Sequence, residues 1–105
     1  MAAEPERFSL VLLRRPTPEP ILEPAELEDV QERHLAYLDE LRRDGALVAA
    51  GGVANAPDAA WTAMILVRKD LREARALAAR DPFVASGLRL AEVATWLVPA
   101  GLLPT

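Results

Sequence analysis

The segment RFSLVLLR, residues 7–14, constrains the fold most, because its pattern predicts a β-strand with apolar side chains on both faces. Successive side chains of a strand point to opposite faces of the sheet. From Leu10 to Leu13 every side chain is apolar, so neither face of this strand is suited to water. The fold must therefore cover both faces of the sheet that contains this strand.

The rest of the chain alternates between segments with the periodicity of helices and segments with that of strands. We expect further strands at 46–54, 61–69 and 89–98, helices at 25–44 and 71–80, and a short turn or single helical coil at 82–87. This βαββαβ order is that of a ferredoxin-like α+β fold, in which a four-stranded antiparallel sheet carries both helices on one face. At 105 residues the chain is expected to form a single domain.

Local signals mark the ends of these elements. Pro24 suits a helix start, and Gly45 is a natural residue to follow a helix end. Asp70 can cap the second helix. Four prolines make residues 15–24 a stiff surface loop, either a spacer or a lid, and residues 99–105 form a short tail.

Two helices cover only one face of a four-stranded sheet. The strand 61–69 also has apolar side chains on both sides, with Ala63 and Ile65 on one and Met64 and Leu66 on the other. The uncovered face would expose more apolar surface than the few hundred Å² that a monomer tolerates. We therefore expect a second copy to pack sheet to sheet, giving a homodimer.

Charge and hydropathy exclude several classes of partner. The net charge is −4 and the pI is near 5.0, and no Lys/Arg run is long enough for a nucleic-acid surface. No stretch approaches the ~20 apolar residues of a membrane span. The start, MAAEPERFSL, carries acids where a secretory signal needs positive charge, so we expect a cytoplasmic protein.

The sequence offers few groups for catalysis. It has no cysteine, which excludes disulfides and thiolate chemistry, and its single histidine lacks metal-ligand spacing. No phosphate-binding loop is evident. We therefore predict no metal and no cofactor.

The single histidine, His34, lies in the middle of the apolar stripe of the first predicted helix. On a helical wheel it falls between Val30 and Leu38, while Arg33 and Asp39 point away. It is either a core residue bonded to a backbone carbonyl or an acid/base group. Asp81, before a proline, is either a capping residue or the partner of the imidazole, and the two roles are compatible.

Two blocks of sequence, HLAYLDELRRDGALVAAGG and ARDPFVASGL, followed by a strand with Trp96, resemble the YciI-like (YCII-related) family. The resemblance covers about residues 30–98. It implies a dimeric α+β barrel built from ferredoxin-like subunits, and it implies that His34 and Asp81 correspond to the His–Asp pair proposed as the acid/base dyad of that family. Relatives of known activity act on small cyclic or aromatic-derived molecules by dehydrochlorination, isomerisation or oxygenation, usually without a metal.

The chain departs from this family pattern at several places. Gln31 stands where many members have an arginine, Gly51-Gly52 stands in place of Gly-Pro, and the hairpin 55–60 is short. Besides the His–Asp pair, we name Tyr37, Gly51 and Phe83 as candidates for substrate binding. Gly51-Gly52 could admit a ligand close to the backbone or mark a strand bulge, and the bulge is the simpler interpretation.

Two functions remain open at this point. In the first, the protein is a cofactor-free enzyme that moves a proton on a small organic molecule through His34 and Asp81, in an isomerisation, an elimination or a related reaction. In the second, it is a non-catalytic dimer that binds a small ligand or a partner protein. The missing arginine and the short hairpin favour the second.

Overall fold

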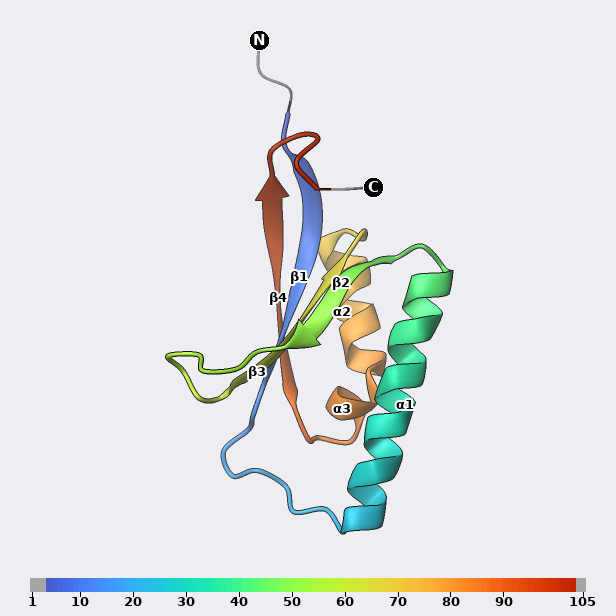
Figure 1. Ribbon diagram of the computed structural model, residues 1–105, viewed down its shortest axis with the longest axis vertical. Helices are drawn as coiled ribbons and strands as arrows, with labels where there is room; N and C mark the ends of the chain where they lie inside the picture. Colours follow the sequence, from blue (N-terminus) through green and yellow to red (C-terminus); the bar gives the residue numbers. More distant parts are fainter. Residues whose placement is uncertain (1–3, 104–105) are drawn as a thin grey trace.

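Four strands form one antiparallel sheet in the order β2-β3-β1-β4 in the computed structural model, which describes residues 4–103 (Figure 1). The strands are β1 (Glu6–Arg14), β2 (Leu47–Gly52), β3 (Trp61–Val67) and β4 (Leu90–Val98). The helices are α1 (Pro24–Arg43), α2 (Leu71–Arg80) and the single turn α3 (Pro82–Ala85). All three helices lie on one side of the sheet in Figure 1. The predicted ferredoxin-like α+β fold is thus confirmed; residues 1–3 and 104–105 of the predicted domain and tail lie outside the described residues.

The long helix α1 has specific signals at both ends. Pro24 occupies its first turn, and the backbone N–H of Glu23 donates to the Glu26 carboxylate at 3.3 Å. At the other end Gly45 takes a φ of +76°, which a glycine adopts without steric cost. The N–H of Gly45 then reaches the Arg42 carbonyl and that of Ala46 the Leu41 carbonyl, which is the Schellman pattern.

The main core lies between the sheet and the helices. Its buried members are Val11, Leu13, Leu41, Ala46, Ile65, Val67, Ala74 and Ala78. On α2 the buried side chains are both alanines. This core holds α1 and α2 against the sheet. It therefore fixes which face of α1, the one that carries His34, is turned toward the sheet.

The chain itself covers one end of the opposite face, which we expected to be bare. Phe8, Leu66 and Val98 form a second buried cluster there, and Leu103 of the C-terminal tail packs against it. The Arg68 guanidinium lies 5.5 Å from the centre of the Phe8 ring. The rest of this face is open: an apolar groove there is lined by residues of all four strands, namely Leu10, Ala49, Ala50, Gly51, Gly52, Val53, Met64, Leu66 and Trp96.

The β2–β3 hairpin corrects one interpretation of the sequence. Gly51 and Gly52 pair in regular register with Met64 and Ala63, so they do not form the expected bulge. The irregularity lies earlier, between Leu47 and Ala49. Both strands are also shorter than predicted. β3 ends at Val67, because the chain then turns away so that Asp70 can accept a hydrogen bond from Glu73 N–H and cap α2.

The proline-rich segment between β1 and α1 has no regular secondary structure, as predicted, but it is anchored. Arg15 N–H donates to the Ala60 carbonyl at 2.7 Å. Glu19 forms ion pairs with Arg15 at 3.2 Å and with Arg89 at 3.1 Å. The segment is therefore tied to the start of β4. Across residues 4–103, no helix is both long enough and apolar enough to cross a membrane.

Candidate active site

His34 and Asp81 are in direct contact although 47 positions separate them in the sequence. The distance from His34 Nδ1 to Asp81 Oδ1 is 2.8 Å. His34 lies on the face of α1 that meets the core and is 9% exposed, and Asp81 lies between α2 and α3 and is 0% exposed. The structure therefore unites the two residues that the sequence singled out.

The local sequence explains why Asp81 is in this position. Pro82 begins α3 and has no N–H of its own to satisfy. Asp81 Oδ1 accepts the N–H of Phe83 at 2.9 Å, so the carboxylate caps α3. The same oxygen meets the imidazole, so the capping role and the role as partner of His34 coexist.

The pair has a defined polarity. Facing a carboxylate, Nδ1 is the nitrogen that carries the hydrogen and donates it, which leaves Nε2 of the neutral ring as the acceptor. Among residues 4–103, Nε2 has no hydrogen-bond partner. It also remains accessible to solvent. His34 thus keeps one nitrogen available to another molecule, while Asp81 can stabilise the positive charge of a protonated ring.

The negative charge of Asp81 also acts on Tyr37. Burial, together with the charge of Asp81, raises the pKa of the Tyr37 phenol to about 12. The Tyr37 hydroxyl donates to the Leu77 carbonyl at 2.6 Å. This hydrogen bond directs Tyr37 toward α2.

A cavity of about 400 Å³ opens beside His34. This volume is near the lower end of the ~300–1,000 Å³ typical of small-molecule sites. The Phe83 ring stacks on the imidazole, with the ring centres 4.1 Å apart and the planes at 20°. The lining is mostly apolar and comes from α1, β2, β3, α3 and the start of β4: His34, Leu35, Leu38, Ala50, Gly51, Gly52, Thr62, Ala63, Met64, Ile65, Phe83 and Arg89.

The candidate substrate-binding residues divide into two groups. Gly51 and Phe83 line the cavity, and a Cβ added at Gly51 would meet no atom within 4 Å. Tyr37 does not line it; it lies instead beside a shallower pocket with Arg33, Arg80 and Pro82. We therefore leave Tyr37 out of the substrate-binding set: it borders the apolar stripe of α1 on the side that faces α2.

Arg89 is a charged residue of the cavity lining that was not among the residues singled out from the sequence. It follows Gly87-Leu88 without any recognisable motif, and its ion-pair partner Glu19 is 70 positions away, so no sequence signal could have marked it. Gln31, which stands where many family members have an arginine, is exposed and does not line the cavity. The guanidinium of this cavity is thus supplied from the turn just before β4, and not from α1.

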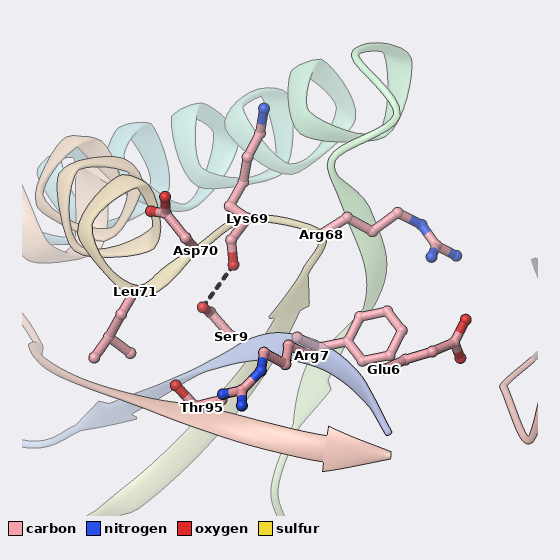
Figure 2. Close-up of a pocket in the computed structure, with 9 residues that line it drawn as sticks. Glu6, Arg7, Ser9, Arg68, Lys69, Asp70, Leu71 and Thr95 are labelled. Atoms are coloured by element: carbon pink, nitrogen blue, oxygen red, sulfur yellow. Dashed lines mark hydrogen bonds between the residues drawn. The ribbon is translucent and has the colours of Figure 1, made fainter. Parts of the chain in front are cut away.

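A second, more polar cavity of about 380 Å³ lies where β1 begins and α2 starts. Figure 2 shows that Ser9 Oγ donates to the Lys69 carbonyl, at 2.7 Å, and that the side chains of Arg7, Arg68 and Lys69 point apart. Because its charged groups do not converge, this cavity offers no coherent binding site. Within residues 4–103, no three His, Cys, Asp or Glu side chains gather closely enough to hold a metal ion.

Comparison with known proteins extends these observations. The structure resembles that of the 5-chloro-2-hydroxyhydroquinone dehydrochlorinase from Burkholderia phenoliruptrix AC1100, solved in complex with 2,5-dihydroxybenzoquinone. The TM-score is 0.59 at 20% sequence identity, over 85% of this chain and 92% of that chain, a likeness of fold. Among curated proteins, no sequence is similar enough to count as a match. The model of the YCII-related domain matches residues 9–97, from β1 to β4 and including both His34 and Asp81, and the chain therefore belongs to the YCII-related family.

Proposed function

We propose that the protein is a cofactor-free enzyme that moves a proton on a small cyclic molecule, in an isomerisation, an elimination or a related reaction. The observation that carries this proposal is the His34–Asp81 contact, which leaves one imidazole nitrogen free beside a cavity of about 400 Å³. The fold neighbour is named as a dehydrochlorinase, and loss of HCl is an elimination of this kind.

In this mechanism His34 Nε2 takes a proton from the bound substrate. Asp81 holds Nδ1, orients the ring and stabilises the imidazolium that forms. The imidazolium then returns the proton at another position of the substrate, or it releases the proton to solvent after a leaving group departs. Such a positioned base contributes about 10²–10⁴-fold to the rate.

The burial of Asp81 favours this function over a purely binding module. A carboxylate with 0% exposure costs free energy unless it is paired, and its Oδ2 has no hydrogen-bond partner among the described residues. Capping the single turn α3 needs a short polar side chain but does not need a charge. The negative charge of Asp81 becomes stabilising once the imidazole of His34 is protonated, because the two groups then form an ion pair.

The proposal includes a homodimer formed through the open face of the sheet. The groove on that face is lined almost entirely by apolar atoms. Ala50, Gly51, Gly52 and Met64 line both this groove and the cavity beside His34. A partner on the open face would thus border the catalytic cavity as well as cover apolar surface.

Turnover by matched variants tests the catalytic roles. Hydroxylated and chlorinated hydroquinones are suitable first substrates, with chloride release and absorbance as readouts. We expect His34→Asn and Asp81→Asn each to lower kcat about 10²–10⁴-fold. Asn still caps α3, so Asp81→Asn should remain folded. The control is Asp29→Asn on the exposed side of α1, which should leave kcat unchanged.

Either of two results would contradict the proposal. One is turnover that is unchanged in both site variants, which would reject His34 and Asp81 as the catalytic pair. The other is binding of cyclic ligands in the cavity, seen as perturbation of the His34 NMR signals, without turnover of any of them. The second result would support the non-catalytic ligand-binding module.

A further inference from the structure

Arg89 lines the cavity beside His34, and part of its guanidinium has no hydrogen-bond partner among the described residues. Its side chain is only 17% exposed, and its Nη1 donates to Glu19 Oε1 at 3.1 Å and to the Leu88 carbonyl at 2.8 Å. A guanidinium has five N–H donors, and those on Nε and Nη2 have no partner within residues 4–103. These nitrogen atoms also remain accessible to solvent.

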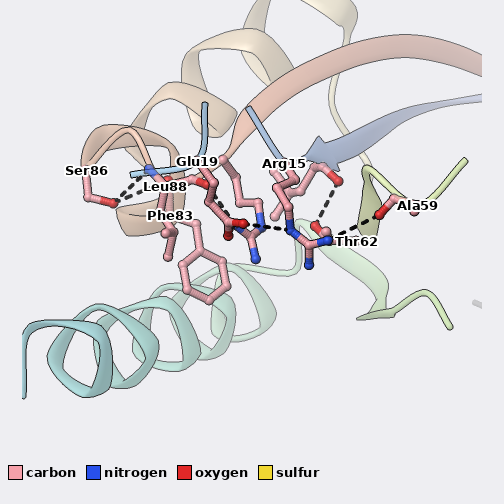
Figure 3. A network of polar contacts seen from close by, with 9 residues as sticks. Arg15, Glu19, Ala59, Thr62, Phe83, Ser86 and Leu88 are labelled. Atoms are coloured by element: carbon pink, nitrogen blue, oxygen red, sulfur yellow. Dashed lines mark hydrogen bonds and ion pairs between the residues drawn. The ribbon is translucent and has the colours of Figure 1, made fainter. Parts of the chain in front are cut away.

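The charges around Arg89 do not balance. Glu19 is shared between Arg89 and Arg15, so one carboxylate serves two guanidinium groups and the cluster keeps an excess positive charge. Figure 3 shows the contact between Glu19 and Arg15. The other carboxylate of the site, Asp81, is engaged by His34 and by the N–H of Phe83. The cavity therefore contains a cation whose charge the protein neutralises only in part.

The shape of the cavity complements this charge. Apolar side chains and the Phe83 ring, which lies against His34, are suited to a flat hydrocarbon ring. A guanidinium is the side chain best suited to grip a carboxylate through two parallel hydrogen bonds. A monocyclic acid satisfies both features of the cavity at once.

We infer that the substrate is a small cyclic organic anion and that Arg89 is the residue that selects it. Glu19 of the proline-rich segment is the internal counter-ion of Arg89, and the substrate competes with it for the guanidinium. This inference rests on the proposed function only in taking the cavity beside His34 as the substrate pocket. It also gives residues 15–23 a role, because Glu19 lowers the affinity of Arg89 for other anions.

The test is a comparison of ligands that differ in charge and hardly in shape. Benzoate and salicylate are titrated into the full-length protein alongside their amides, benzamide and salicylamide, and Kd is measured by calorimetry and from the NMR signals of His34. In the unmodified protein we expect the acids to bind about tenfold or more tightly than the amides, as a charge-assisted hydrogen bond predicts.

Three variants test whether Arg89 and Glu19 cause this preference for acids. Arg89→Gln should abolish the preference for the acids and leave amide binding unchanged, whereas Arg89→Lys should keep part of it. Glu19→Gln should tighten the acids several-fold without affecting the amides, because the competing carboxylate is removed. Melting temperatures verify folding, and Glu19→Gln on the exposed loop tests the inference even where a change at Arg89 unfolds the protein.

Several outcomes would overturn the inference: equal binding of acids and amides by the unmodified protein, a preference that survives Arg89→Gln, no tightening in Glu19→Gln, or no binding of either acid at millimolar concentration. The readout is binding, so it is separate from the test of catalysis. A preference for acids in a protein without turnover would reject only the enzyme, and turnover confined to neutral compounds would reject only the role of Arg89.

Discussion

A single carboxylate oxygen, Oδ1 of Asp81, accepts the N–H of Phe83 and also meets the imidazole of His34. The backbone hydrogen bond fixes the carboxylate independently of the imidazole. Phe83, which follows directly in α3, then stacks on the same ring. Asp81 thus contacts the edge of the His34 ring and Phe83 covers its face, and together they fix the orientation of the ring in the absence of a ligand.

Tyr37 permits a clean spectroscopic test, because it is the only tyrosine of the chain. Burial and the charge of Asp81 raise its pKa to about 12, whereas an unfolded tyrosine titrates near 10. We expect the tyrosinate absorbance to appear around pH 12 in the folded protein and around pH 10 in denaturant. Because the folded-state pKa is the higher one, this residue contributes stability that is complete below about pH 10 and is lost as the pH rises toward 12.

The matched control for this effect is Tyr37→Phe. At neutral pH this variant should lose about 1 kcal/mol of unfolding free energy, because the hydrogen bond to the Leu77 carbonyl is removed. Its stability should then fall less steeply between pH 10 and 12 than that of the unmodified protein, in urea denaturation at each pH. A tyrosinate signal near pH 10 in the folded protein would show that the phenol is not held as the structure has it.

Physical reasons explain why the sequence could indicate part of the candidate site. The helical wheel placed His34 toward the core, because the apolar stripe around it is regular. The Asp-Pro step and the family resemblance indicated Asp81. Periodicity cannot tell which neighbour a boundary residue meets: Tyr37 was named as a candidate for substrate binding, and its hydroxyl donates to the Leu77 carbonyl of α2. Arg89 was missed because its setting depends on tertiary contacts alone.

At the scale of elements, boundaries were predicted best where a backbone constraint enforces them. The helix expected at 25–44 is Pro24–Arg43, and the strand expected at 89–98 is Leu90–Val98. The hairpin was predicted less well: the two glycines suggested a bulge, but the register shifts between Leu47 and Ala49. Side-chain pattern does not encode register shifts, which follow from how the paired strands twist and pack.

The end of α1 allows a direct test of such a constraint. Gly45→Ala places a Cβ at a φ of +76°, in the left-handed region, which costs roughly 1–2 kcal/mol. We expect this loss in the free energy of unfolding, measured with urea, although no atom lies within 4 Å of the added Cβ. The control is Gly51→Ala, which also meets no atom within 4 Å but has no positive φ and should not pay this conformational cost. Equal losses in the two variants would contradict the assignment to the backbone.

For the whole molecule, the decisive feature is that the sheet is apolar on both faces while the helices cover only one. The C-terminal tail and Arg68 cover one end of the other face, where Phe8, Leu66 and Val98 are buried. Beyond that end, Trp96 on β4 remains 44% exposed in the apolar groove. A large aromatic side chain at such a position is typical of the centre of a protein interface.

The proposed homodimer can be tested at this tryptophan. Trp96→Asp places a charge in the apolar groove, and pairing with a second copy would have to bury that charge. We therefore expect the variant to sediment as a monomer at micromolar concentration. The unmodified protein should sediment as a dimer. The matched control is Ile21→Asp on the proline-rich segment, which also exchanges an exposed apolar residue (97% exposed) for an acid, but away from the sheet; it should remain a dimer. Because the groove and the cavity beside His34 share four residues, Trp96→Asp should also weaken ligand binding in that cavity. An unmodified protein that sediments as a monomer, or a Trp96→Asp dimer as stable as the original, would show that the open face is not the surface through which two copies associate.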